Sequence, residues 1–218
     1  MLLEIRAVPP FEKNGFVLGC ERTREAVLID PGDEVQALLD VVSANDLDVK
    51  HILLTHGHVD HVSGVAAATR ALGAPVYLHS GDLQLYQNAV QFGQFFGLTV
   101  EQPPPVDVFY DRGHERVTFG DLEVRVLHTP GHCPGGVCLQ VGPAGSVGTQ
   151  LFVGDTLFAG SIGRTDLPGG DYPTLMRSIR QVLLPLGDDA VVYPGHGPKT
   201  TIGHERRTNS FLKDERLY

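Results

Sequence analysis

Cysteine, tryptophan and long apolar segments are scarce or missing in this chain of 218 residues. Its three cysteines, Cys20, Cys133 and Cys138, form no paired disulfide framework, so we expect a reduced, cytoplasmic protein. No apolar segment is long enough to cross a bilayer, and residues 1–6 lack the basic start and apolar core of a signal peptide. These absences argue against a membrane-spanning class and a disulfide-rich secreted class.

Basic residues are also outnumbered, with 17 Lys and Arg against 26 Asp and Glu and a net charge of -9. This balance argues against nucleic acid and anionic membranes as partners. The hydrophobic share of 42% supplies a core, and 20% charged residues is ordinary for a soluble protein. We interpret residues 1–218 as one domain, and the composition indicates no oligomeric state.

Two halves of the chain show a similar order of predicted elements. The first half predicts strands at 2–8, 16–20 and 26–30, with Asn14-Gly15 as a hairpin turn, a helix capped near Asp33, a strand at 51–55, a helix at 62–72 and a strand at 76–79. The second predicts strands at 116–119, 122–127, 135–141 and 151–153, a helix at 172–184, a strand at 190–193 and a helix at 203–212. This order predicts an α/β fold with helices on the outer faces of the sheet.

The stretch 81–105 between the halves carries aromatic residues among glutamines and glycines, and it ends in three prolines. Its aromatic residues are Tyr86, Phe92, Phe95 and Phe96. Two interpretations stay open: short helices that pack these rings into the core, or a cap whose rings line a substrate pocket.

The densest chemical signal is the segment Thr-His-Gly-His-Val-Asp-His at residues 55–61. It places His56, His58, Asp60 and His61 within six positions, directly after an apolar strand. Imidazole and carboxylate groups bind divalent zinc, manganese and iron. Gly57 lets the backbone approach the ions closely.

Three later turns also place a metal-competent side chain just beyond a predicted strand, namely His132, Asp155 and His196. We therefore predict two metal sites: His56, His58 and His132 on one ion, Asp60, His61 and His196 on the other, and Asp155 between them. Asp30 is expected to hold the fold or accept a hydrogen bond near a ligand turn. The ions expected are two divalent metals, zinc first, with iron or manganese as alternatives.

The segments 55–61, Thr129-Pro-Gly-His132, Gly154-Asp155, Pro194-Gly-His196 and Asp30-Pro-Gly32 together resemble the signature of the metallo-β-lactamase superfamily. The resemblance implies an αβ/βα four-layer sandwich with two mixed β-sheets and the metals at one edge. The stretch 154–170 is similar to the glyoxalase II (hydroxyacylglutathione hydrolase) branch in its short bacterial form.

Two departures concern the glutathione part of the substrate in that branch. Full-length members carry a C-terminal helical domain that grips glutathione, and this chain is expected to lack it. Gly197-Pro198 also stands where Glu-Tyr usually follows the last ligand.

The chemistry expected is hydrolysis by a water that two cations bridge and deprotonate near neutral pH. Asp60 and Asp155 are the expected catalytic carboxylates, because they reduce the cation charge and can accept a proton. A thioester suits such a centre because its thiolate, with a pKa near 8.5, leaves without an acid. Arg164 can bind a substrate carboxylate, or pair with Asp166 or Asp171.

We therefore predict a binuclear hydrolase of small acyl thioesters such as S-lactoylglutathione. The first alternative is a mononuclear iron persulfide dioxygenase, which the resemblance implies would use His56, His132 and Asp155. A lactonase and a metal-stabilised scaffold without activity are further alternatives, and the missing export signal argues against a β-lactamase.

Overall fold

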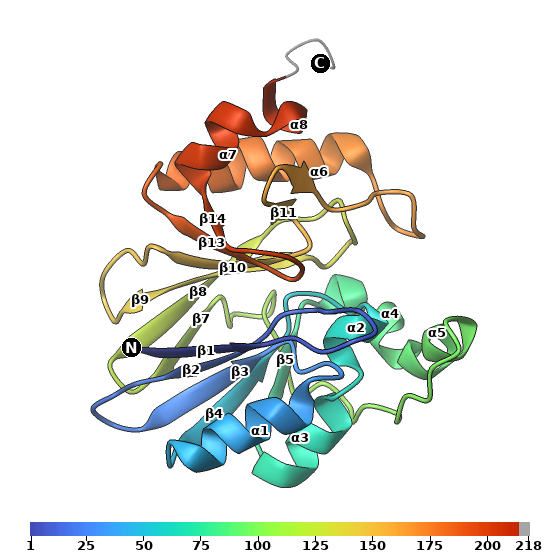
Figure 1. Cartoon of the computed structure of the whole chain (residues 1–218), viewed down its shortest axis with the longest axis vertical. Helices are drawn as coiled ribbons and strands as arrows, with labels where there is room; N and C mark the ends of the chain where they lie inside the picture. The colour runs from blue at the N-terminus through green and yellow to red at the C-terminus, as the bar shows by residue number, and fades with distance from the viewer. Residues whose placement is uncertain (214–218) are drawn as a thin grey trace.

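Two β-sheets packed face to face, with helices on both outer faces, form four layers in the computed structural model, which describes residues 1–213 (Figure 1). The α/β four-layer sandwich with two mixed sheets is therefore confirmed. No helix among the described residues is long and apolar enough to span a membrane.

The first sheet has the strand order β1-β2-β3-β4-β5-β6. Its strands are β1 (Leu2–Arg6), β2 (Gly15–Gly19), β3 (Glu25–Ile29), β4 (Asp48–Leu53), β5 (Val76–Leu78) and β6 (Val108–Phe109). The first three strands pair antiparallel, and the pairs from β3 to β6 are parallel. The carboxyl ends of β3, β4 and β5 therefore meet at one edge of the sheet.

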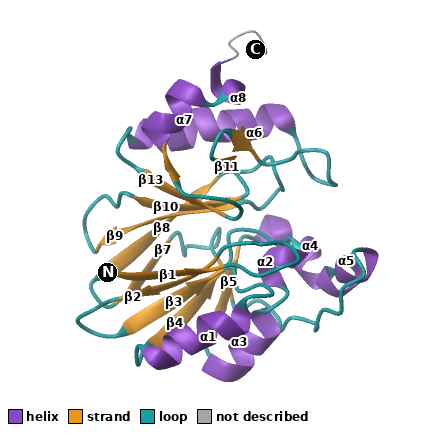
Figure 2. Cartoon of the chain, viewed as in Figure 1, coloured by secondary structure: helices purple, strands orange, loops and turns teal. Residues whose placement is uncertain are grey.

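The second sheet has the order β14-β13-β10-β9-β8-β7. Its strands are β7 (Arg116–Phe119), β8 (Leu122–His128), β9 (Val137–Pro143), β10 (Gln150–Gly154), β13 (Val191–Pro194) and β14 (Thr200–Thr201). Strands β10 and β13 pair in parallel and the other pairs are antiparallel. A small hairpin, β11 (Leu157–Phe158) and β12 (Ser161–Ile162), follows β10 (Figure 2).

Helices cover the outer face of each sheet. The first sheet is covered by α1 (Val35–Ala44) and α3 (Val65–Leu72), and the second by α6 (Tyr172–Ser178) with its continuation η2 (Ile179–Leu183), η3 (Leu184–Leu186), α7 (Ile202–Thr208) and α8 (Ser210–Lys213) (Figure 1). Leu38, Val41 and Val42 form the buried side of α1, because residues three and four apart share one helix face.

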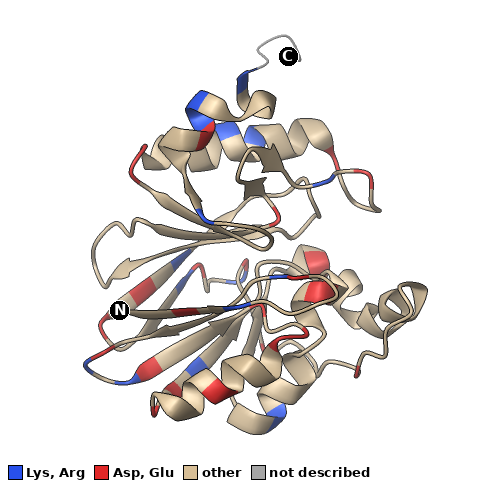
Figure 3. Ribbon diagram, viewed as in Figure 1, with Lys and Arg blue, Asp and Glu red and all other residues tan. Residues whose placement is uncertain are grey.

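Three apolar clusters fill the spaces between these layers, and the middle one is shared by both sheets. There Phe16 of β2 meets Phe152 of β10 edge to face, with ring centroids 4.9 Å apart. Strands β9, β10 and β13 carry no charged residue, as Figure 3 shows. Such strands are buried on both faces and hold their carboxyl ends rigidly.

The structure differs from three of the predicted elements. Asn14-Gly15 is no hairpin turn, because Gly15 already belongs to β2 and the Asn14 side chain bonds to the turn after β13. The helix predicted at 62–72 is split into α2 (Val59–Val62) and α3, and the final predicted helix is split into α7 and α8. At the first break, a Cβ on Gly64 would lie 2.2 Å from the carbonyl oxygen of Gly32, so a close backbone contact sets the break.

The stretch 81–105 folds into short helices, η1 (Ser80–Asp82), α4 (Leu83–Gln87) and α5 (Ala89–Phe95). Tyr86 is buried, and its hydroxyl donates to the carbonyl oxygen of Pro104 at 2.7 Å. Phe92 also packs against the apolar cluster that includes Leu38, Ile52 and Val76, as the core interpretation requires. Phe95 and Phe96 are 83% and 53% exposed, so the core interpretation is wrong for these two rings.

Candidate metal centre

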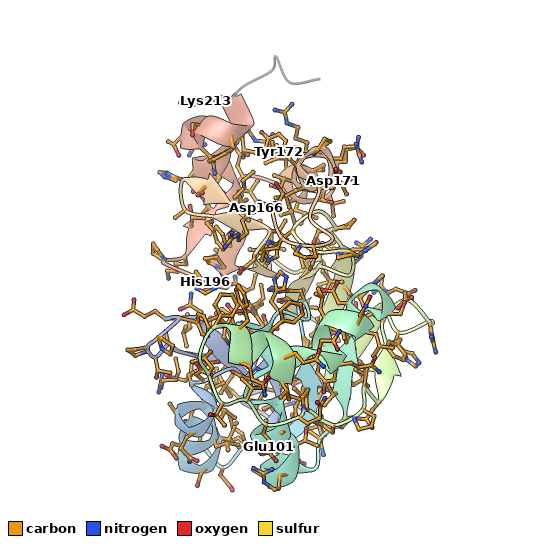
Figure 4. The ribbon with its side chains drawn as sticks, turned by 90° about the vertical axis from the view of Figure 1, so that its right-hand side faces the viewer. Glu101, Asp166, Asp171, Tyr172, His196 and Lys213 are labelled. Atoms are coloured by element: carbon orange, nitrogen blue, oxygen red, sulfur yellow. The ribbon has the colours of Figure 1, made fainter. Side chains whose placement is uncertain are left out.

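The seven predicted ligands come together where four strands of two sheets end. His56 and His58 follow β4, and Asp60 and His61 lie in the short helix α2. His132 follows β8, Asp155 follows β10, and His196 follows β13. Figure 4 shows His196 at the junction of the two halves, below Asp166. The predicted placement beyond strand ends is confirmed.

Among residues 1–213, three groups of ligand atoms lie close enough to hold a metal ion. They are His56 with His58 and His132, His56 with His61 and Asp155, and Asp60 with His61 and His196, each with its atoms within 4.8 Å of one another. Asp155 also lies 3.4 Å from His61 Nε2 and 3.7 Å from the Nε2 atoms of His132 and His196. The first and third groups match the two predicted sites, with Asp155 between them.

Hydrogen bonds to the outer nitrogens of His56, His61 and His132 fix which nitrogen of each ring faces the centre. His132 Nδ1 donates to the carbonyl oxygen of Arg164 at 2.7 Å, so the lone pair of its Nε2 points inward. That Nε2 lies 2.9 Å from His58 Nδ1. Two imidazole nitrogens from opposite halves of the fold therefore share one small volume.

Asp30 orients two more histidines. Its Oδ2 accepts from His61 Nδ1 at 3.0 Å and from the Thr55 hydroxyl at 2.6 Å. Because that hydroxyl donates its proton to Asp30, its oxygen accepts from His56 Nδ1 at 3.1 Å. The Nε2 atoms of His56 and His61 are thus left to face the centre. Asp30 adopts a φ of 49°, a costly conformation for a residue other than glycine.

Electrostatics divide the histidines into two kinds. Burial, and then the charge of His132, lowers the pKa of His58 to about 4. Burial alone would lower the pKa of His61 too, but the carboxylates of Asp60, Asp155 and Asp30 raise it to about 10. Positive charge is therefore favoured beside His61, which is the condition that a cation site needs.

The neighbouring histidines lower the pKa values of the two carboxyl groups, Asp60 and Asp155. Burial alone would raise the pKa of Asp60, but His61 and His196 hold it well below the usual range. Asp60 Oδ2 accepts from His196 Nε2 at 3.0 Å. The pKa of Asp155 is also lowered, because His61 and His132 outweigh its burial. Both side chains are therefore carboxylates at neutral pH.

The donor set fits a pair of divalent ions. Within the described residues, His56 Nε2 is a buried atom without a hydrogen-bond partner, and His61 Nε2 and Asp155 Oδ1 form no hydrogen bond but lie 3.4 Å from each other. A buried polar atom left unpaired is costly, so its retention points to a ligand that it binds. Five imidazoles and two carboxylates suit zinc, iron or manganese. The remaining five histidines join no such group among the described residues.

Arg164 contacts the centre through its backbone, and its side chain pairs with Asp166. Its guanidinium forms a two-bond pair with Asp166 at 2.7 and 2.8 Å, while its carbonyl oxygen holds the His132 ring. The structure thus shows the ion-pair alternative to substrate binding. Both side chains are exposed, at 59% and 68%, so the pair is weak and exchangeable.

A second set of residues, which the sequence patterns do not indicate, ties the ligand turns together. Lys13 and Glu34 form a buried ion pair beneath the Asp30 turn. Asn14 donates to the carbonyl oxygens of Pro194 and Gly197 on either side of His196. Asp82 is buried beside the His56 turn. Of these, Glu34 and Asp82 follow predicted strands as the ligands do, but the sequence does not indicate their bonding partners.

At Gly195 the backbone passes so close to the centre that there is no room for a side chain. A Cβ at this position would lie 2.3 Å from Asp155 Oδ1 and 2.6 Å from His61 Cε1, inside van der Waals contact. Gly195→Ala should therefore displace a ligand and weaken metal binding roughly 10-fold or more. Gly197 in the same turn has no atom within 4 Å of such a Cβ, so Gly197→Ala should strain the backbone but keep metal affinity. Metal titration of both variants checks this, and equal affinities would contradict it.

Residues 9–196 match the metallo-beta-lactamase superfamily. The chain belongs to that superfamily. A relative in the superfamily, hydroxyacylglutathione hydrolase GloC of Haemophilus influenzae, is 37% identical over 99% of this chain and 100% of its own. The crystal structure of BLEG-1 B3 metallo-beta-lactamase matches with a TM-score of 0.86 and 36% identity, covering 98% of this chain and 100% of that one. The crystal structure of TTHA1623 in a di-iron-bound form matches with a TM-score of 0.84 and 43% identity, over 96% and 100%. The resemblance drawn from the motifs is confirmed.

Proposed function

We propose that this chain is a binuclear metal-dependent hydrolase of small acyl thioesters such as S-lactoylglutathione. The observation that carries the proposal is the convergence of seven side chains into two adjoining groups, with Asp155 between them at 3.4 Å from His61 and 3.7 Å from His132. The full-length similarity to hydroxyacylglutathione hydrolase GloC supports the substrate class. The di-iron form of a relative supports the count of two ions, with zinc, iron and manganese all suited to the ligands.

Bound ions of this kind supply Lewis acidity and an oxygen nucleophile at neutral pH. The protein's own contribution is orientation. Asp30 and Thr55 fix the rings of His61 and His56, and the Arg164 carbonyl oxygen fixes His132. These rings need no reorganisation when substrate arrives, which is where much of the rate advantage of a rigid site originates.

Two carboxylates are proposed as catalytic groups. Asp60 is ionised at neutral pH and accepts a hydrogen bond from His196 Nε2 at 3.0 Å, so its carboxylate can also accept a hydrogen bond from the attacking water and orient it. Asp155 faces histidines of both groups and lowers the net positive charge between them. A thiolate leaves without protonation because thiols ionise near pH 8.5. The proposed substrate class therefore needs no further general acid.

Metal removal tests the proposal directly. Dialysis against a chelator should lower the hydrolysis of S-lactoylglutathione by about a thousandfold, and two equivalents of zinc, iron or manganese should restore it. Metal content is measured beside the rate, with anaerobic handling for iron. A chelated sample, free of metal by elemental analysis and as active as before, would refute a metal-dependent hydrolase.

Two other activities have a specific observation in their favour. The 36% identity to BLEG-1 B3 metallo-beta-lactamase favours β-lactam hydrolysis, and the di-iron form of TTHA1623 shows that the site of a relative can hold iron, which persulfide oxidation would require. In the latter case His56, His132 and Asp155 would hold one iron. A panel of thioester, β-lactam, lactone and glutathione persulfide, with oxygen uptake recorded for the last, separates these activities.

A further inference from the structure

A carboxylate outside the seven proposed ligands is buried between two of the ligand turns. Asp82 is the last residue of η1, and its side chain is 0% exposed. It belongs to the stretch that follows β5, a strand whose end supplies none of the seven ligands. The mechanism proposed above gives it no part.

Asp82 bonds both turns that carry the first ligand group. Its Oδ2 accepts from the backbone N–H of Gly57 at 3.1 Å and from the Cys133 thiol at 3.0 Å, and its Oδ1 accepts from the N–H of Gly135 at 2.6 Å. Gly57 lies between His56 and His58 in the chain, and Cys133 directly follows His132. One side chain therefore connects the turns of all three histidines across the two halves of the fold.

The backbone of Asp82 packs directly against Gly57 and Gly135, with no room for a side chain at either glycine. A Cβ on Gly135 would lie 2.5 Å from the Asp82 nitrogen, and a Cβ on Gly57 would lie 2.9 Å from its carbonyl oxygen. Among the described residues, the three donors to this side chain, two backbone N–H groups and a thiol, are all neutral. A buried carboxylate is costly to keep in this way, and a purely structural link could use a neutral side chain.

We propose that Asp82 is a positioning residue that sets the spacing between the His56–His58 turn and the His132 turn, and so the metal affinity of the first ligand group. The inference rests on the proposed function, because it takes that group to hold an ion. The hydrogen bonds of the Asp82 side chain among the described residues go to Gly57, Cys133 and Gly135, so the second group, Asp60 with His61 and His196, should not depend on it.

The test compares Asp82→Asn with Asp111→Asn. An asparagine at 82 keeps the size but turns an amide NH2 toward groups that are themselves donors. Asp111 is a matched control, because its carboxylate accepts from the Ser80 N–H at 3.0 Å and the Ser80 hydroxyl at 2.6 Å. It thus bonds to the same turn, η1, with no bond to either ligand turn.

Zinc is titrated into metal-free protein of all three forms. Wild type and D111N should bind two equivalents with equal affinity, and D82N should bind one as tightly and the other roughly 10-fold to 100-fold more weakly. Imidazole NMR signals identify the site: with one equivalent bound to D82N, the signals of His61 and His196 should shift and those of His58 and His132 should not. The inference would be overturned if D82N bound both zinc equivalents as tightly as wild type. It would also be overturned if the first equivalent shifted the signals of His58 and His132 and left those of His61 and His196 unchanged.

A measurement without metal separates this inference from the proposed function. In chelator, the amide hydrogens of Gly57 and Gly135 should exchange with solvent at least about tenfold faster in D82N than in wild type or D111N. Unchanged exchange at both amides would overturn the role of Asp82 whatever the protein binds. Wild type that takes up no metal would instead refute the proposed function, while faster exchange would still show that Asp82 holds the two turns.

Discussion

Asp155→Ala is expected to lower kcat/KM for thioester hydrolysis by about a thousandfold or more while the protein stays folded. The carboxylate faces His61, His132 and His196 at 3.4 to 3.7 Å, so its removal deprives both ligand groups of their shared anion. The loss of about 4 kcal/mol of transition-state stabilisation underlies the size of the effect. Steady-state kinetics with measured metal content, and circular dichroism for the fold, check the result.

Asp189→Asn serves as the surface control for this variant, because Asp189 is exposed and precedes β13, at the opposite end of that strand from His196. Its kinetics and stability should match those of the wild type, since exposed substitutions seldom change stability by more than about 0.5 kcal/mol. An Asp155→Ala protein that unfolds even when metal is supplied would favour a metal-stabilised scaffold. A variant with full activity would remove Asp155 from the reaction altogether.

The buried pair of Lys13 and Glu34 should give the largest effect on stability. Both side chains are 1% exposed, and Lys13 Nζ lies 2.5 Å from Glu34 Oε1. The same ammonium group also donates to the carbonyl oxygen of Asp30. Lys13→Met leaves the Glu34 carboxylate buried with the N–H of Gly32 as its remaining partner. We expect a loss of about 3–5 kcal/mol in the free energy of unfolding.

Urea unfolding in the presence of chelator measures this loss without a contribution from bound metal. The double variant Lys13→Met with Glu34→Gln should recover part of the stability, because a neutral amide can still accept from Gly32 without a buried charge. A cost below about 1 kcal/mol for Lys13→Met would show that the pair is solvated or dispensable.

The fold and the placement of the seven proposed ligands could be predicted from the sequence because both follow from local patterns. An apolar run such as residues 51–55 specifies a buried strand, and the polar residues that follow must then lie at its carboxyl end. His132, Asp155 and His196 obey the same rule. Strands that pair side by side bring such ends to one edge of the fold.

The residues that hold the ligand turns could not be predicted because their partners lie far away in the chain. Lys13 and Glu34 are 21 positions apart, and Asp82 lies 25 positions from Gly57 and 53 from Gly135. No periodicity records contacts of this kind. The helix break at Gly64 could not be predicted for a similar reason, since it is caused by close contact with the carbonyl oxygen of Gly32, 32 positions earlier in the chain.

Each ligand group draws two side chains from the amino-terminal sheet and its helix, and one from the opposite sheet. An ion bound to either group would therefore act as a cross-link between the halves of the sandwich. Neither half of the sandwich supplies a complete ligand group alone. The two halves must therefore keep their relative position whatever substrate the centre binds. Loss of that alignment would release both ions together.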